Sequence, residues 1–147
     1  MVNIKFIDIL LIEDNHGDVL LTQEALKDSK VINKIHIATD GLEASDFLFK
    51  RNNFQNALMP DLIILDLNLP KKGGIELLSE IKENDKLKKI PVVILTSSKA
   101  EEDIFKSYDL HANCYITKPI DLEKFTQVVL SIENFWLSVV TLPKHFD

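Results

Sequence analysis

The sequence predicts an α/β fold, a doubly wound parallel sheet of five strands with five helices distributed over both faces. Two observations support this prediction. Three short apolar runs, at residues 7–12, 62–65 and 91–95, are typical of strands buried on both faces of a parallel sheet. Segments with helical spacing of apolar residues separate the strands, and this alternation indicates right-handed crossovers between parallel neighbours.

The first half of the chain predicts three strands and two helices. After the strand at 7–12, apolar residues recur at helical spacing and predict the first helix. Residues 34–37 alternate between polar and apolar, the period of a strand half exposed at the edge of a sheet. Asp40-Gly41 then begins a second helix over 42–50, and a polar loop leads to the next buried strand.

The second half of the chain predicts two strands and three helices. A helix follows Gly73-Gly74, and a weaker one over residues 100–108 has Ile104 and Phe105 as its main apolar contacts. The remaining elements are a buried strand at 91–95, a short strand at 114–117 and a last helix from 121 to about 138.

The composition narrows the class of protein. A chain of 147 residues suffices for one domain with a substantial buried core. Its 46% hydrophobic and 27% charged residues are typical of a soluble globular protein. The net charge of −6, with basic residues scattered along the chain, argues against nucleic-acid binding, which usually needs a basic face.

The sequence also gives expectations for location and extent. A single cysteine, Cys114, excludes an internal disulfide and favours a reducing compartment. No apolar run approaches the ~18 residues of a membrane span, and residues 1–6 lack the pattern of a secretory signal. We therefore expect a cytoplasmic protein whose residues 1–147 form a single domain, with an apolar C-terminal extension at 135–147 and no output domain.

Polar side chains stand where the predicted strands end. Glu13-Asp14 follow the first strand, Asp66 the third, Thr96 the fourth and Lys118 the fifth. Each has a plain structural explanation as a helix cap, a turn residue or a solvated lysine. However, the carboxyl ends of parallel strands meet at one edge of the sheet, where ligands bind. The coincidence at four strand ends predicts one functional site.

These residue types suit Mg²⁺-assisted phosphoryl transfer. Two or three carboxylates with water complete the octahedral shell of Mg²⁺, and a lysine and a hydroxyl can stabilise the transferred oxygens. A carboxylate such as Asp66 can act as the nucleophile and form an acyl phosphate. Without a cation, clustered carboxylates repel one another, so a carboxylate pKa should be raised. The four histidines show no zinc-ligand spacing.

The same residues resemble a known family. The signature comprises Glu13-Asp14, Asp66, Pro70, Gly74, Thr96, Tyr115 and Lys118-Pro119, and it is similar to that of the response-regulator receiver domain. The resemblance covers nearly the whole chain and implies a flavodoxin-like sheet of order 2-1-3-4-5. Residues 12–18, the polar loop after the second helix, and residues 110–119 and 135–143 resemble a narrower branch, the small stand-alone receivers associated with phytochrome histidine kinases.

The resemblance implies a phosphoacceptor site. The aspartate that matches Asp66 takes a phosphoryl group from a phosphohistidine of a histidine kinase in that family. Asp14 and Asp66 would ligate Mg²⁺ directly, Glu13 through water, and Asn68 through its backbone carbonyl. The protein would then be a phosphoacceptor that assists its own phosphorylation and dephosphorylation, and not an enzyme.

The resemblance also implies a switch. Lys118 would pair with the phosphoryl oxygens, Thr96 would move to bond the phosphoryl group, and Tyr115 would turn inward. Phosphorylation adds about −1.5 to −2 charge and would bias a two-state equilibrium. The fourth helix, fifth strand and fifth helix would report the change to other proteins. A half-buried strand aromatic is the open alternative for Tyr115.

The branch implies particular partners. The kinase would be of the phytochrome type, and the apolar end of the chain at 135–147 would form a homodimer. Packing of this end on its own domain is the open alternative. The downstream protein is unknown, and we expect neither a nucleic acid nor a membrane as partner.

Two other function classes compete with the receiver. A Mg²⁺-dependent phosphatase of the haloacid dehalogenase type also uses an aspartate after a strand, but Asn68 stands where that family has a second aspartate, and its further acidic ligands lie downstream. An interaction module that has lost phosphorylation is the other class, and the retention of every matched site residue argues against it.

Overall fold

The computed structural model describes residues 6–27, 32–106, 112, 114–118, 123–124, 127–128 and 131. The strands are β1 (Phe6–Ile12), β2 (Ile32–Ala38), β3 (Leu62–Asp66), β4 (Val92–Thr96) and β5 (Cys114–Thr117). The α-helices are α1 (His16–Lys27), α2 (Gly41–Phe49), α3 (Gly74–Glu83) and α4 (Lys99–Lys106). Two short 3-10 helices, η1 (Asn52–Phe54) and η2 (Leu87–Lys89), lie in the connections.

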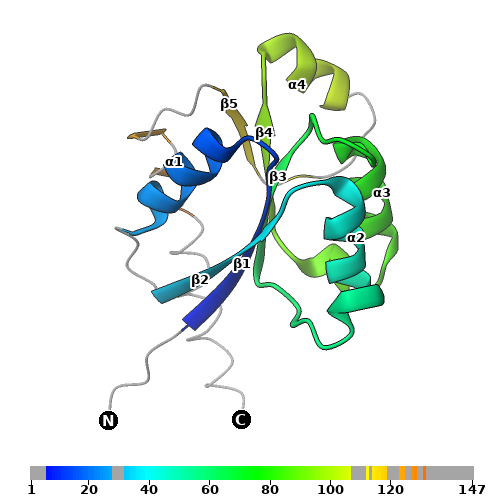
Figure 1. Cartoon of the computed structure of the whole chain (residues 1–147). Helices are drawn as coiled ribbons and strands as arrows, with labels where there is room; N and C mark the ends of the chain where they lie inside the picture. Colours follow the sequence, from blue (N-terminus) through cyan, green and yellow to red (C-terminus); the bar gives the residue numbers. More distant parts are fainter. Residues whose placement is uncertain are drawn as a thin grey trace, which may run out of the picture.

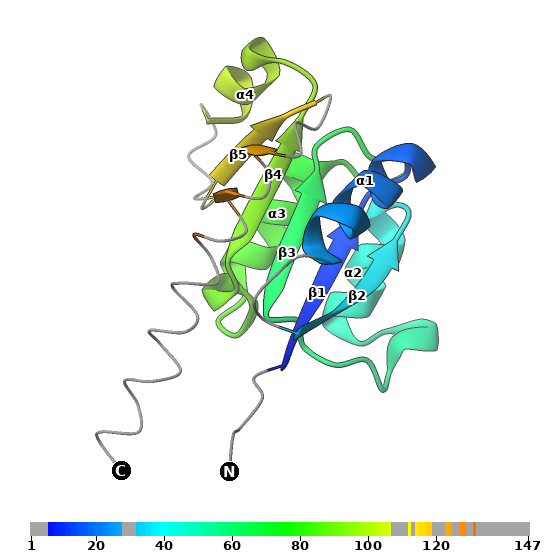
Figure 2. The ribbon, with the colours of Figure 1, turned by 90° about the vertical axis from the view of Figure 1, so that its left-hand side faces the viewer.

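The five strands form one parallel sheet in the order β2-β1-β3-β4-β5. This order confirms the predicted fold, with β2 at one edge and β5 at the other (Figure 1 and Figure 2). All residues of β3 and β4 are buried, as expected for central strands covered on both faces. Because all the strands are parallel, the carboxyl ends of β1, β3, β4 and β5 lie side by side along the same end of the sheet, called its carboxyl edge below.

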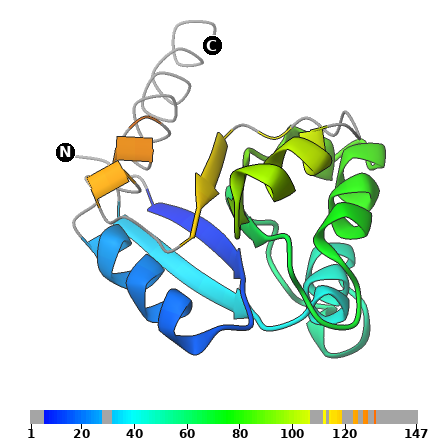
Figure 3. The ribbon, with the colours of Figure 1, turned by 90° about the horizontal axis from the view of Figure 1, so that it is seen from above.

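Helices cover both faces of the sheet. α1 lies on one face, and α2, α3 and α4 lie on the other (Figure 3). An apolar cluster lies on each face of the sheet, and successive residues of β1 point into one cluster and then the other. Leu10 packs with α2 and α3, and Leu11 packs with α1. Apolar packing on both faces thus fixes the strand ends relative to one another.

Four α-helices are described where five were predicted. The described residues within the predicted last helix, 123–124, 127–128 and 131, are helical, and Val128 packs against the core on the α1 face. The apolar extension predicted at 135–147 lies outside the described residues. Among the helices that the structure describes, none combines the length and apolar character needed to cross a bilayer.

The prediction for the apolar face of α4 was half wrong. Phe105 is fully buried, but Ile104 is 60% exposed. The second inward residue is instead Glu102, three positions before Phe105 and therefore on the same face of the helix. Glu102 is held there by Lys99 at 2.6 Å and Lys106 at 3.5 Å.

Candidate functional site

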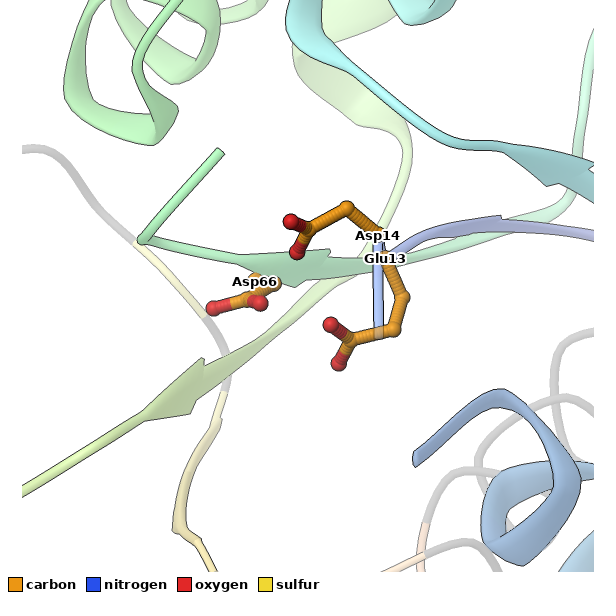
Figure 4. Close-up of side chains that lie close together, drawn as sticks. All are labelled: Glu13, Asp14 and Asp66. Atoms are coloured by element: carbon orange, nitrogen blue, oxygen red, sulfur yellow. The ribbon is translucent and has the colours of Figure 1, made fainter. Parts of the chain in front are cut away.

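Three carboxylates gather at the carboxyl edge of the sheet, as the sequence predicted. Glu13 and Asp14 follow β1, and Asp66 ends β3. One oxygen from each lies within 4.8 Å of the others, and the three groups turn toward a common space (Figure 4). Glu13 and Asp66 are buried, and Asp14 is exposed. The cluster is therefore open to solvent on the side of Asp14.

Lys118 places its ammonium among these carboxylates. Its Nζ lies 2.9 Å from Asp66 Oδ2 and 2.9 Å from Glu13 Oε1. The backbone positions this lysine, because its amide donates to the Thr96 carbonyl at 2.6 Å and so continues the pairing of β5 with β4. The structure thus brings together side chains from three separate strand ends.

Asp18 also contacts Lys118, and sequence reasoning missed it. Its Oδ2 lies 2.9 Å from Lys118 Nζ. Asp18 is in the first turn of α1, and its amide donates to Asn15 Oδ1 at 2.9 Å. The available signal was its position: the first turn of the helix that leaves β1 lies at the same edge of the sheet as Asp14.

The electrostatics of the site are those of crowded carboxylates. Burial raises the pKa of Glu13 to about 7, and its hydrogen bond with Asp66 adds to this rise. Burial disfavours the charge of Lys118, but hydrogen bonds to carboxylates outweigh that effect and raise its pKa. A carboxylate pKa is therefore raised, as expected, but burial contributes more to the rise than repulsion from Asp66 does.

The hydroxyl of Thr96 is buried at the end of β4, next to β3. Its Oγ1 has no hydrogen-bond partner among the residues that the structure describes. A buried hydroxyl without a partner is costly and calls for an explanation, such as a ligand that it awaits. Thr96 therefore retains a free donor at this edge of the sheet.

Asn68 is an exposed residue in the loop directly after β3. Its amide donates to Asp66 Oδ1 at 3.0 Å in a local turn. Its side-chain nitrogen donates to Ser97 Oγ at 2.8 Å and to Glu101 Oε2 at 2.9 Å. These bonds tie the loop after β3 to the start of α4. The loop that follows Asp66 is thus held to a neighbouring helix.

Tyr115 lies on β5 and packs against α4. Its ring meets Phe105 edge-on at 5.8 Å, and Lys106 Nζ lies 4.8 Å from the ring centre. The side chain is half-buried, as the open structural alternative expected. The predicted switch residue is therefore in contact with the helix that it would report to.

The donor set fits a divalent metal. Three oxygen donors from carboxylates converge within 4.8 Å. Hard divalent cations such as Mg²⁺ and Mn²⁺ prefer such oxygen ligands and keep several waters. A cation would also relieve the repulsion that contributes to the raised pKa of Glu13. Charge and ligand chemistry thus agree with the predicted metal site.

Comparisons with known proteins agree with this geometry. The response regulator receiver domain matches residues 9–130. Response regulator Rcp1 of Synechocystis sp. is 51% identical over 135 residues, which cover 92% of each chain. The crystal structure of the phosphorylated cyanobacterial phytochrome response regulator RcpA has 53% identity and a TM-score of 0.78, covering 94% of this chain and 99% of that one. The Mn²⁺-bound form of Rcp1 has 50% identity and a TM-score of 0.77, covering 93% and 99%.

The matched region contains every residue of the predicted signature. Rcp1 is a response regulator, and this chain is 51% identical to it over nearly its whole length, so a phosphatase of the haloacid dehalogenase type is not favoured. The strand order and the acidic edge agree with the same family. The chain is therefore a response regulator of two-component systems and belongs to the receiver domain family, with close similarity to the cyanobacterial phytochrome response regulator RcpA.

Proposed function

We propose that Asp66 accepts a phosphoryl group from the phosphohistidine of a histidine kinase, in a reaction that requires Mg²⁺. Membership in the receiver family implies a histidine kinase as partner. The observation that carries the proposal is the meeting of a buried carboxylate, a lysine ammonium and an acidic cluster at one edge of the sheet. The buried Thr96 hydroxyl, which has no hydrogen-bond partner in the described part of the chain, supports it further.

The transfer is a single displacement at phosphorus. A carboxylate oxygen of Asp66 attacks, the bond from phosphorus to the histidine nitrogen breaks, and an acyl phosphate forms while the imidazole leaves. Lys118 is already 2.9 Å from Asp66, where it can neutralise charge on the phosphoryl oxygens. Thr96 supplies a hydroxyl that can donate to one of them.

Asp14 and Asp66 are the proposed direct ligands of Mg²⁺, with Glu13 acting through water and Asn68 through its backbone carbonyl. When bound, Mg²⁺ would supply charge stabilisation for the transferred oxygens. Glu13 and Asp66 are held by Lys118 and by the turn at Asn68. The carboxylates are thus kept near one another before a metal arrives.

The same proposal includes a switch and a biological setting. Thr96 and Tyr115 would carry the change to α4, which Tyr115 already contacts through Phe105. The similarity to RcpA supports a phytochrome-type kinase as the donor. We further propose that residues 1–147 form one receiver domain, which acts in the cytoplasm as a phosphoacceptor and not as an enzyme. Its C-terminal end would form a homodimer.

Phosphotransfer tests the proposal directly. The full chain is incubated with acetyl phosphate, with and without Mg²⁺, and its intact mass and modified residue are determined. We expect one phosphoryl group on Asp66 that depends on the metal. An autophosphorylated phytochrome kinase should transfer faster than an unrelated histidine kinase. Modification at another residue, or equal modification without a divalent ion, would contradict the proposal.

The affinity for Mg²⁺ should depend on pH through Glu13. Its pKa of about 7 lies above the usual 4.5 of a glutamate, so a large share of the metal-free protein carries a proton on Glu13 near neutral pH. This proton stabilises the folded state relative to the unfolded state, and that contribution fades as the pH rises from 4.5 through about 7. Because the metal must displace the proton, affinity should rise between about pH 6 and about pH 8 and then level off.

Calorimetric titration in two buffers of different ionisation enthalpy measures this proton release. Glu13→Gln is the matched variant, because it keeps the shape of the side chain and removes the titrating group. Its Mg²⁺ affinity should be nearly constant over the same pH range. A pH dependence equal to that of the wild type would assign the released proton to another group.

A further inference from the structure

We infer that Asp18 is a positioning residue for Lys118 that holds the ammonium in place while the other carboxylates change their roles. The inference rests on the proposed function of Asp66 as the phosphoacceptor. It starts from the 2.9 Å contact between Asp18 Oδ2 and Lys118 Nζ. Asp18 is neither part of the acidic cluster that fits a metal nor part of the signature that marked the site.

The ammonium of Lys118 is saturated in this structure. Its Nζ donates to Asp66 Oδ2 at 2.9 Å and to Glu13 Oε2 at 3.1 Å, and it forms an ion pair with Asp18 Oδ2 at 2.9 Å. An ammonium has three protons to donate, so three acceptors satisfy it completely. A phosphoryl oxygen can bind Lys118 only if one of these carboxylates gives up its place.

Two of the three carboxylates have other tasks during the reaction. Glu13 and Asp66 belong to the cluster that fits a metal ion, and Asp66 also forms the new bond to phosphorus. Their oxygens are therefore the ones that leave the ammonium. Asp18 lies outside the cluster and has no competing task, so it remains the fixed partner of Lys118 throughout.

The fold holds Asp18 firmly enough for this role. Its amide is bonded to Asn15 Oδ1, and its carbonyl accepts from Thr22 Oγ1 at 2.9 Å. Thr22 and Val19 are buried against the sheet and fix the helix. Asp18 stands in the first turn of α1, where the helix dipole favours an acidic side chain. A lysine has a flexible four-carbon stem, so a fixed partner limits the positions that its charge can occupy.

A double-mutant cycle tests the inference on the full chain. The initial rate of Asp66 phosphorylation by acetyl phosphate at saturating Mg²⁺ is measured for wild type, Asp18→Asn, Lys118→Met and the double variant. Asp18→Asn should slow the reaction about tenfold, a coupling within the usual range for contacting charged residues. In the Lys118→Met background the same substitution should have no further effect. A role limited to the stability of α1 would slow both backgrounds equally.

Glu24→Gln is the matched control, because it removes one negative charge from the same helix at an exposed residue. Within the described residues, Glu24 forms an ion pair with Lys27 at 3.2 Å and with no other side chain. Its rate should equal that of the wild type. Asp18→Ala removes the carboxylate altogether. It should also slow phosphorylation when Lys118 is present and have no further effect in the Lys118→Met background. An unchanged or faster rate for Asp18→Asn, or equal slowing in both backgrounds, would overturn the inference.

The measurements distinguish an error in the proposed function of the site from an error in the role of Asp18. If wild type is not phosphorylated at Asp66, or Lys118→Met reacts as fast as wild type, the proposed function of the site is wrong. If wild type reacts, Lys118→Met is slow and Asp18→Asn is as fast as wild type, only the role of Asp18 is wrong.

Discussion

Asp66→Asn should abolish phosphorylation of this protein by acetyl phosphate and by a histidine kinase alike. The amide lacks the nucleophilic carboxylate, so the acyl phosphate cannot form. Loss of the reacting group should lower the rate by on the order of a thousandfold or more. Asp66 is 2% exposed at the end of β3, and an asparagine keeps its shape. Intact-mass measurement after incubation with acetyl phosphate and Mg²⁺ gives the fraction phosphorylated.

Asp85→Asn is the matched control for this change. Asp85 is an exposed aspartate that pairs with Lys88 at 3.2 Å, away from the acidic cluster. It should be phosphorylated at the wild-type rate. If Asp66→Asn still gained a phosphoryl group, with Asp14 or Glu13 as the acceptor, the acidic cluster would be the reactive unit and Asp66 would lose its special role.

Much of the site could be predicted because it depends on local patterns. Short apolar runs identify buried strands, and each run ends where its polar residues begin. Parallel pairing then places all the carboxyl ends at one edge, whichever strands are neighbours. This reasoning placed Glu13, Asp14, Asp66 and Lys118 correctly, because it needs no knowledge of how the side chains are packed.

The parts that were missed depend on side-chain packing. The contact between Asp18 and Lys118 requires the rotation of α1 about its axis, which the sequence of the helix leaves undetermined. Nothing in the sequence indicates that Glu102 is buried, since a charged residue is rarely buried without partners. Its partners Lys99 and Lys106 lie on its own helix, and their ion pairs allow it to face inward. Periodicity of apolar residues cannot detect a buried charge of this kind.

Gly41→Ala should strongly destabilise the fold and disturb the site from a distance. A Cβ atom at Gly41 would lie 1.9 Å from the carbonyl oxygen of Lys72 and 2.7 Å from its carbonyl carbon. These are backbone atoms, which cannot move aside as a flexible side chain can. We expect a loss of about 3 kcal/mol of unfolding free energy, at the upper end for overpacking. Urea unfolding followed by circular dichroism measures it.

The clash also has a functional consequence, because Gly41 contacts the loop that follows β3. The Gly41 amide donates to the Pro70 carbonyl at 3.3 Å, and Asp40 pairs with Lys71 at 3.4 Å. Lys71 has a left-handed backbone, with φ of 69°, so this loop is held in a conformation that non-glycine residues rarely adopt. If the loop shifts to admit the methyl group, Asn68 should shift with it. The Mg²⁺ affinity of the folded variant should therefore fall.

Gly73→Ala separates this effect from the general cost of replacing a glycine. Gly73 precedes α3 with φ of −69°, and a Cβ atom there would meet nothing within 4 Å. Its unfolding free energy should stay within about 0.5 kcal/mol of wild type, as for most surface substitutions. A Gly41→Ala variant as stable as Gly73→Ala would mean that the loop after β3 is free to move. The contact between α2 and this loop would then have no part in holding Asn68 beside Asp66.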